Sequence, residues 1–355
     1  MIDFFIKVKQ QEAQHLPFVI FKKPNKKKLV GFFQKNDHLY FAENFKEKGF
    51  VFAPFEGSQM ILIPKAESVK WETRMPLYEA SFNSGIDKIN EEDLAQKAHF
   101  EALVQKGIDA IHQGVFNKVV LSREEIVALP NFDLVKVFKK LIENYPSAFC
   151  YCWFHPKIGL WMGATPERLL KANKNRFYTM ALAGTKIGDD PENVEWNPKE
   201  MEEQQIVTDF ILENLKNIAS EVAISSPYTL KAGSLLHIIT DIEGVINNHS
   251  NLNQVVEVLH PTPAVCGLPK NVAKDFILRN EGYDRSYYTG FLGELNIKEF
   301  DKHRTKSDLY VNLRCMQVKD QEAHLYIGCG ITKDSNPEKE WKESVNKAQT
   351  MKKVL

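Results

Sequence analysis

The chain has 355 residues, of which 43% are hydrophobic, so it is long enough to build a sizeable core. Lys and Arg together number 46, as do Asp and Glu, and this zero net charge gives no overall field that would attract nucleic acid or an anionic membrane. No apolar run approaches the roughly 20 residues that span a bilayer, and the N-terminus lacks a signal-peptide pattern. We therefore expect a cytoplasmic protein that binds a small molecule.

Cysteine usage also indicates a cytoplasmic protein, and the chain has the organisation of a single domain. The cysteines are odd in number, lie among apolar residues and form no CxxC pair, which is typical of reduced core thiols; they are Cys150, Cys152, Cys266, Cys315 and Cys329. The chain shows no internal repeat, low-complexity tract or long linker. One compact domain over residues 1–355 is therefore predicted.

The apolar pattern predicts alternating groups of strands and helices. Short runs at 18–21, 29–33, 39–41 and 60–64 predict strands, with no helix before residue 70. A helix is expected over 86–113 and another near 132–143, separated by a strand at 118–123. Further strands are predicted at 149–155, 158–162, 178–185, 309–317 and 323–327.

A helix is also predicted from Asn197, a capping residue followed by proline. Glu203 lies on the apolar stripe of this helix, one turn before Val207. Because a bare buried carboxylate is costly, Glu203 either meets a cation, from Lys, Arg or a metal, or projects beyond the core into water near the helix N-terminus. The sequence leaves both interpretations open.

The last helix is predicted from a capping-box pattern at 335–338. Glu340, Glu343 and Lys347 share one face of it, opposite the apolar face of Trp341 and Ala348. From this pattern alone, the simplest interpretation is a solvated charged face with an i,i+4 pair between Glu343 and Lys347.

The segment LHPTPAVCGLP at 259–269 contains prolines that exclude a regular helix or a central strand. It lies between an apolar run and a helix expected from about residue 271. It is either a rigid connector without chemistry or part of a pocket wall.

Several polar residues stand where packing does not require them, and together they indicate an anionic ligand. Arg314 can bind a carboxylate through two parallel hydrogen bonds, and the backbone of Gly328-Cys329-Gly330 can approach a ligand closely. Two or three carboxylates at one point suit Mg²⁺. The other candidates are Lys118 on a valine-rich strand, Glu167 after Thr-Pro, and Glu203.

These residues resemble the chorismate-utilising enzymes of menaquinone, siderophore and tryptophan biosynthesis. The order and approximate spacing match from about residue 95 onward, in KVVLSR at 118–123, GATPE at 163–167, AGT at 183–185, the helix start at 199–207, HIIT at 237–240, HPTPAV at 260–265, Arg314, GCG at 328–330 and EWKE at 340–343. Residues 1–95 show only strands compatible with the N-terminal part of that family, so 96–355 would be the catalytic part. The resemblance implies an α+β fold: a single large domain with antiparallel β-sheets stacked as a sandwich and helices packed outside.

Within the family, the His-Pro-Thr-Pro loop is similar to that of the isochorismate synthases. Ala183 stands where aminodeoxychorismate synthases place a nucleophilic lysine, and the loop differs from the Pro-Ala/Gly-Gly type usual in anthranilate synthases. Salicylate synthase, which eliminates pyruvate from isochorismate at the same site, remains the alternative enzyme. A chorismate-binding protein with a degenerate site is the alternative outside catalysis.

The resemblance implies that Lys118 is the general base, which deprotonates a water attacking C2 of chorismate. Glu167 is the general acid, which protonates the departing C4 hydroxyl. Lys118 has to lose its proton at neutral pH and Glu167 has to keep its own, so a buried setting is expected for both.

The resemblance also implies a Mg²⁺ site and a set of substrate contacts. Glu203 and Glu343 would bind the ion directly and Glu340 through water. Substrate contacts are expected from Ala183, Gly184, Thr185, His237, Thr240, Ala264, Arg314, Gly328, Gly330 and Lys347. His237 lies in an apolar strand, where a plain core role is equally expected, and Gln204 and Gln205 depart from the His or Asn often found after the metal glutamate. No amidotransferase subunit is implied, and a monomer is expected.

Overall fold

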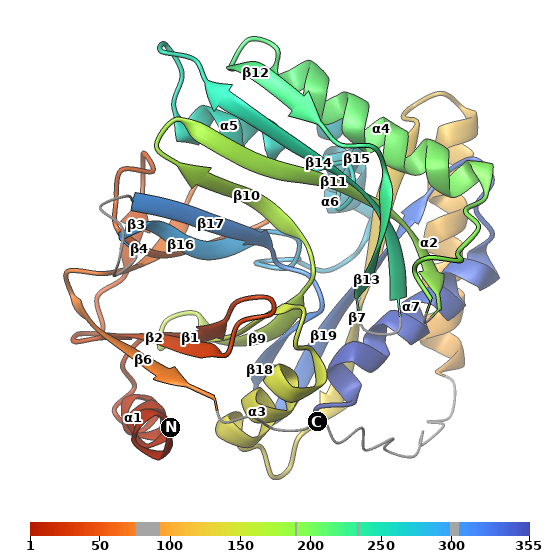
Figure 1. Cartoon of the computed structure of the whole chain (residues 1–355). Coiled ribbons are helices and arrows are strands. Elements are labelled where there is room, and N and C mark those ends of the chain that lie inside the picture. The colour runs from red at the N-terminus through yellow and green to blue at the C-terminus, as the bar shows by residue number, and fades with distance from the viewer. Residues whose placement is uncertain (76–92, 189, 233–234, 299–304) are drawn as a thin grey trace.

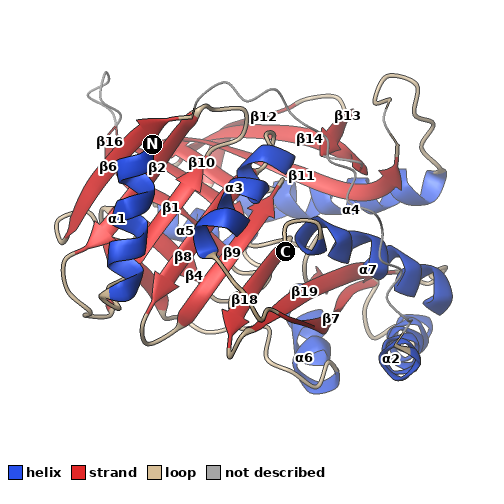
Figure 2. Cartoon of the chain, turned by 90° about the horizontal axis from the view of Figure 1, so that it is seen from below, coloured by secondary structure: helices blue, strands red, loops and turns tan. Residues whose placement is uncertain are grey.

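The computed structural model describes residues 1–75, 93–188, 190–232, 235–298 and 305–355. Within them, the strands form two antiparallel sheets that pack face to face, with helices on the outside (Figure 1). Figure 2 shows the same layers from below, with the helices grouped around the sheets. The predicted α+β class, with stacked antiparallel sheets, is confirmed.

The first sheet has the strand order β15-β7-β19-β18-β9-β8-β1-β2-β6. Its strands are β1 Phe18–Lys22, β2 Lys28–Gln34, β6 Ser68–Arg74, β7 Lys118–Ala128, β8 Phe149–His155, β9 Gly159–Thr165, β15 Gly267–Leu268, β18 Cys315–Lys319 and β19 Glu322–Ile331.

The second sheet has the order β12-β14-β11-β10-β17-β16-β4-β5-β3, and β13 also pairs with β14. Its strands are β3 Tyr40–Ala42, β4 Gly49–Ala53, β5 Met60–Pro64, β10 Arg168–Asn173, β11 Arg176–Ile187, β12 Ala219–Ile224, β13 Tyr228–Ala232, β14 Leu235–Ile246, β16 Phe291–Lys298 and β17 Thr305–Val311. Because β1 pairs with β8 and β4 with β16, the N-terminal strands continue both sheets.

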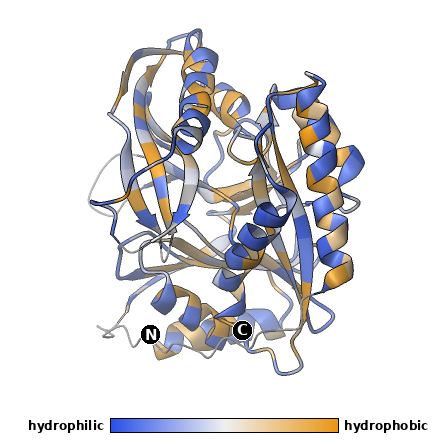
Figure 3. Ribbon diagram, turned by 90° about the vertical axis from the view of Figure 1, so that its right-hand side faces the viewer, coloured by the Kyte–Doolittle hydropathy of each residue, from blue (hydrophilic) through white to orange (hydrophobic). Residues whose placement is uncertain are grey.

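Helices cover the outer faces of the sheets and the β7 end of the first sheet. They are α1 Ile2–Ala13, α2 Leu94–His112, α3 Leu134–Asn144, α4 Pro198–Leu215, α5 Leu252–Leu259, α6 Lys270–Asn280 and α7 Pro337–Lys352. Apolar residues of α1 and α3 pack on the first sheet, those of α4 and α5 on the second, and those of α2 and α6 beside β7. In Figure 3 hydrophobic and hydrophilic residues alternate along the helices, as expected of amphipathic helices.

Aromatic side chains fill the space between the two sheets. Phe149 of β8 stacks on Tyr310 of β17 with ring centroids 4.2 Å apart, and Phe21 of β1 meets Phe50 of β4 at 5.3 Å. Such pairs contribute about 0.5–1.5 kcal/mol each beyond the area they bury. The sheets are therefore rigidly joined, which fixes the loops at their edge.

The structure corrects the predicted elements at several places. Helix α1 is not predicted by the sequence pattern, although its buried residues Phe4, Phe5 and Val8 have helical spacing. The predicted strands also omit several that the structure contains, namely β4, β6, β10, β12, β13, β15 and β16. Residues 86–92 of the helix expected over 86–113 lie outside the described residues, and its remainder is α2.

Two further corrections bear on the site. The strand expected over 309–317 is wrong: β17 ends at Val311, and β18 begins at Cys315 after a turn in which Arg314 has φ +48°. Helix α7 is capped by Asn336, whose side chain accepts from the Lys339 N–H, so the capping box expected one residue earlier is wrong. No helix in the described ranges is long and apolar enough to cross a membrane.

Candidate active site

A cavity of about 150 Å³ lies where the two sheets meet helices α4 and α7. Strands β7, β11, β14 and β19 contribute to its walls, as do the loops that precede β10, β15, β16 and β18. The predicted residues that line it are Glu167, Ala183, Gly184, Glu203, His237, Ala264, Arg314, Gly328, Gly330, Glu340, Glu343 and Lys347. The fold thus gathers most of the predicted site at one place.

Glu167 is a buried carboxyl in the wall of this cavity. It follows Pro166 in the link between β9 of the first sheet and β10 of the second, and its backbone is held because its carbonyl accepts from the Val311 N–H at 3.0 Å. Glu167 is 3% exposed, and burial raises its pKa to about 8, although Lys118 and Arg314 oppose the shift. The carboxyl therefore keeps its proton at neutral pH, as a general acid requires.

Lys118 begins β7 and is 1% exposed. Its Nζ lies 2.6 Å from Oε1 of Glu203, whose side chain is 20% exposed. Helix α4 carries Glu203. Pro198 at the first position of this helix fixes where the helix begins, and so which of its residues face the cavity. Of the two interpretations of Glu203, the one with a cation is correct, and the cation in this structure is Lys118.

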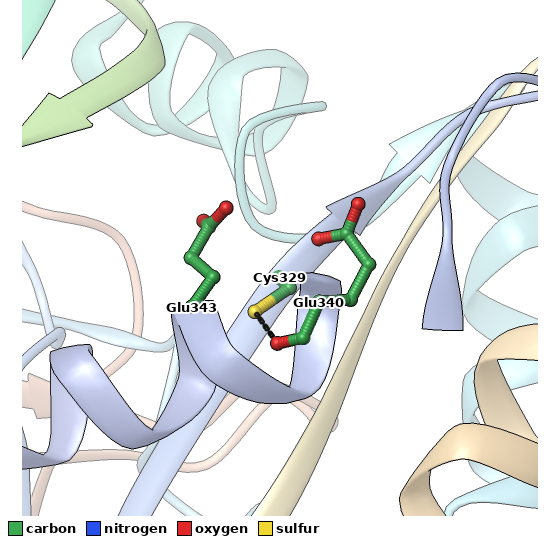
Figure 4. Close-up of side chains that lie close together, drawn as sticks. All are labelled: Cys329, Glu340 and Glu343. Carbon is green, nitrogen blue, oxygen red and sulfur yellow. Dashed lines mark hydrogen bonds between the residues drawn. The ribbon is translucent and has the colours of Figure 1, made fainter. Parts of the chain in front are cut away.

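Helix α7 turns two further carboxylates toward the cavity. The possible ligand atoms of Cys329, Glu340 and Glu343 lie within 4.8 Å of one another, and both carboxylates project to the same side of α7 (Figure 4). The Cys329 thiol donates to the Glu340 carbonyl at 3.4 Å, and burial raises its pKa, so it stays neutral.

These donors fit a hard divalent cation. Glu203, Glu340 and Glu343 line one cavity and offer carboxylate oxygens, the ligands that Mg²⁺ prefers. The neutral Cys329 thiol adds no strong ligand for such an ion. Glu203 lies outside the group of close ligand atoms that Glu340 and Glu343 form, and it is paired with Lys118, so a Mg²⁺ site that includes all three carboxylates stays a prediction.

The charged face of α7 is not solvated as its pattern suggests. Glu340 is 5% exposed and the Lys347 side chain 11%, while Glu343 is more open. The expected pair between Glu343 and Lys347 is present at 2.5 Å. Lys347 also donates to the Gly328 carbonyl at 3.1 Å, which ties α7 to the glycine-rich end of β19.

The cationic end of the cavity contains Arg314 and the two glycines of β19. Burial lowers the pKa of Arg314, but an arginine remains charged in proteins. A Cβ at Gly328 would lie 2.7 Å from the Tyr288 hydroxyl, and one at Gly330 would lie 2.9 Å from Oε1 of Glu203. Glycine at these two positions therefore allows the Tyr288 hydroxyl and the Glu203 carboxylate to approach the backbone of β19 closely.

His237 is packed in the wall and also borders the cavity. It is 3% exposed, its Nδ1 lies 3.1 Å from the Gly184 carbonyl, and burial together with Arg314 lowers its pKa to about 4. The imidazole is therefore neutral at physiological pH. Its contact with substrate stays a prediction.

One predicted substrate contact is placed differently. Thr240 is not one of the described residues that line the cavity. It is 2% exposed, and its hydroxyl accepts a hydrogen bond from the Gln204 side chain at 2.7 Å. Gln204 thereby fixes α4 against β14 behind the wall. The side chain of Thr185 lies outside the described part of the chain.

Comparison with known proteins decides the family. The family described as chorismate binding enzyme matches residues 63–355. The chain belongs to the chorismate-binding enzymes.

Named relatives of this enzyme include isochorismate synthases. It is 29% identical over 269 residues to "Salicylate biosynthesis isochorismate synthase" of Pseudomonas aeruginosa, a match that covers 73% of this chain but only 55% of that protein's length. It is 27% identical over 286 residues to "Isochorismate synthase EntC" of Escherichia coli K12, covering 77% of this chain and 71% of that one.

Solved structures share the fold of this chorismate-binding enzyme. A structure described as a 2,3-dihydroxybenzoate-specific isochorismate synthase, DhbC, from Bacillus anthracis gives a TM-score of 0.78 at 21% identity and covers 98% of this chain and 99% of that one. Anthranilate synthase component I from Streptococcus pneumoniae gives 0.68 at 17% identity, covering 94% and 89%. At these identities the likeness shows the fold alone.

The proline-rich loop of this chorismate-binding enzyme is both a connector and a wall. Ala264 and Val265 line the cavity, while the His260 imidazole instead lies 3.2 Å from the Pro54 carbonyl. The peptide bonds before Pro261 and Pro269 are cis. Leu268 of β15 pairs with Lys118, so the loop also supports the start of β7.

Some residues of the cavity are not predicted from the sequence. They include Leu182, Glu200, Tyr288, Thr289, Tyr326 and Met351. The polar pair Tyr288-Thr289 before Gly290 is a weak sequence signal, because a turn of this kind has no periodicity to identify its inward side. The others belong to elements whose apolar faces are shared between core and cavity.

Proposed function

We propose that this chorismate-binding enzyme is an isochorismate synthase, an isomerase that uses Mg²⁺ to convert chorismate reversibly to isochorismate. The observation that carries the proposal is a buried Glu167 carboxyl, whose pKa burial raises to about 8, in the same cavity as Glu203, whose carboxylate is bound to Lys118. Lys118 is not itself among the described residues that line the cavity, but its amine reaches the wall at Glu203, so the proposed acid and base belong to one site. The names of EntC and of the Pseudomonas relative support the same reaction.

The proposed reaction exchanges one hydroxyl group for another. Lys118, as the free amine, takes a proton from water while the water oxygen bonds to C2 of the ring. The ring double bonds shift, the C4–O bond breaks, and Glu167 gives its proton to the departing hydroxyl, which leaves as water. The reverse reaction uses the same two groups in exchanged roles, so the conversion is reversible.

The carboxylates of α4 and α7 are proposed to hold Mg²⁺. Glu203 and Glu343 would be direct ligands and Glu340 would act through water. When bound, the ion would neutralise these carboxylates and fix the ring carboxylate of the substrate. Lys118, which pairs with Glu203 in this structure, would then no longer be the counterion of that carboxylate.

The enolpyruvyl carboxylate of the substrate is proposed to bind between Arg314 and the backbone of Gly328 and Gly330. The cations Arg314 and Lys347 border that end of the cavity. Neutral His237 would contact the ring carboxylate or hydroxyl region from β14. The wall formed by Ala183, Gly184 and Ala264 would shape the pocket without supplying a nucleophile.

Replacing Arg314 with lysine is expected to raise the KM for chorismate about 10- to 100-fold while kcat changes little. A lysine keeps the charge but loses the planar fork that binds a carboxylate bidentately, and a hydrogen bond to a charged group is worth about 1.5–3 kcal/mol. Steady-state kinetics at saturating Mg²⁺ measure this change. An unchanged KM would remove Arg314 from the substrate site.

Other expectations belong to the same proposal. We expect a cytoplasmic monomer that works without an amidotransferase subunit and binds neither nucleic acid nor a membrane. The neutral sequence and the alanine at position 183 support these expectations.

The product of the reaction tests the proposed function. The protein is incubated with chorismate and Mg²⁺, without ammonia, and the products are followed by NMR. Isochorismate in equilibrium with chorismate supports the proposal. Salicylate with pyruvate would identify a salicylate synthase instead, and an unchanged substrate would indicate a protein that only binds chorismate.

A further inference from the structure

A buried ion pair lies behind the cavity, in a part of the chain to which the proposed reaction assigns no role. Arg285, after α6, binds Glu281 through two hydrogen bonds, Nη2 to Oε1 at 2.5 Å and Nε to Oε2 at 2.7 Å. Both side chains are 1% exposed. Neither residue is among those that line the cavity in the described chain.

The remaining donors of Arg285 reach three separate parts of the cavity wall. Nη2 donates to the Val120 carbonyl at 2.6 Å, and Nη1 donates to the Val265 carbonyl at 3.0 Å and to the Thr289 hydroxyl at 3.2 Å. Val120, Val265 and Thr289 all line the cavity. One guanidinium thus connects strand β7, the proline-rich loop and the turn before β16.

Glu281 completes this connection from the other side. Its Oε1 accepts from the backbone N–H of Ser122 at 2.7 Å and from the Ser122 hydroxyl at 2.8 Å. Strand β7 is therefore held at Val120 and at Ser122, both of which follow Lys118 within the first half of the strand. The position of the Lys118 amine depends on this segment of β7.

The turn held by Arg285 has an unfavourable backbone conformation. Thr289 is fully buried with φ +59°, a left-handed conformation that a β-branched residue rarely adopts. Its hydroxyl accepts from Arg285 and donates to the Tyr288 carbonyl at 2.6 Å. Such a conformation persists only where surrounding contacts impose it.

We propose that Arg285, held by Glu281, is a positioning residue for the reaction: it fixes β7, the proline-rich loop and the Tyr288-Thr289 turn in the mutual arrangement that catalysis requires. This inference rests on the proposed function. A buried ion pair is weak support for stability, because taking two charges out of water offsets much of their attraction. Its use here is geometric, since a planar fork can bind three wall segments at once and an apolar pair cannot.

Arg285→Lys tests this role. Lysine keeps the charge opposite Glu281 but cannot reach Val120, Val265 and Thr289 together. We expect kcat to fall about 100-fold, with the KM for chorismate within about threefold, because a displacement of about 1 Å in an active site costs on the order of 10²-fold. Kinetics and thermal unfolding of wild-type and variant enzymes are measured together.

The control is Lys23→Met, which breaks a partly buried ion pair whose residues do not line the cavity. Lys23 binds Glu294 at 2.6 Å and Asp308 at 3.1 Å, and none of the three lines the cavity. This control should lower Tm and leave kcat unchanged. If Arg285→Lys does not fold, Glu281→Gln, which keeps the side-chain shape, is judged by the same criteria, with an expected fall in kcat of about tenfold or more.

Each outcome decides the proposal. A folded variant with a reduced kcat and a nearly unchanged KM supports positioning. A folded variant with wild-type kcat, or one whose activity only follows its folded fraction, overturns it while the proposed function stands. Wild-type enzyme that forms no isochorismate overturns the proposed function, and this inference with it.

Discussion

Replacing Glu167 with glutamine is expected to lower kcat by about 10²- to 10⁴-fold, the usual contribution of a general acid. Glutamine has the same shape but has no acidic proton to give to the departing C4 hydroxyl. The rate of isochorismate formation measures the loss, and circular dichroism should show an unchanged fold. Glu257→Gln, on the exposed side of α5, is the matched control and should keep full activity.

The same substitution has a pH-dependent effect on stability. The folded pKa of Glu167, about 8, lies above its ordinary value of 4.5, so between these values the native state binds a proton that the unfolded state has released. Stability from this group is therefore present below the ordinary pKa and is lost as pH rises toward 8. The Tm of Glu167→Gln relative to wild type should rise across that window. A near-normal rate, or a Tm difference independent of pH, would contradict the proposed acid.

Replacing Lys118 with alanine should also lower kcat by about 10²- to 10⁴-fold, because the variant loses the amine that is proposed to deprotonate the attacking water. The variant separates this role from a purely structural one. Lys118 is bound to Glu203 at 2.6 Å, so its removal frees a carboxylate for Mg²⁺. Mg²⁺ affinity, measured by titration calorimetry, should be maintained or increased.

The control for Lys118→Ala is Glu203→Gln. This variant keeps Lys118 but loses a proposed ligand, so it should weaken Mg²⁺ binding as well as turnover. A Lys118→Ala variant with near-normal turnover would exclude the lysine as base. One that loses Mg²⁺ binding in parallel with Glu203→Gln would show that Lys118 acts through the metal site instead.

Much of the fold is predictable because its elements have clear periods. Helix α4 and strands β8 and β9 follow directly from apolar spacing and caps. The turn at Arg314 is not predictable in this way, because the pattern of residues 309–317 indicates one continuous strand. Nothing in that pattern indicates the left-handed backbone conformation at Arg314. Helix α1 is missed because its apolar residues are few and cluster at its start.

The candidate site, like the fold, is only partly predictable from the sequence. Glu203 and Glu340 can be selected as polar residues on helical faces, but whether each is solvated depends on partners far away in sequence. Lys118 of β7 is 85 positions from Glu203 of α4, and only the tertiary fold brings the two side chains together. Arg285 has no sequence signal at all, since its role comes from three carbonyl and hydroxyl groups on separate segments.

The origin of the new hydroxyl is the most direct test of water addition at C2. Chorismate is converted by the wild-type enzyme with Mg²⁺ in ¹⁸O-labelled water, the reaction is stopped within one turnover, and the product is examined by mass spectrometry and NMR. We predict isochorismate that carries one ¹⁸O atom, at C2. Unlabelled isochorismate, or no isochorismate, would contradict the proposed reaction.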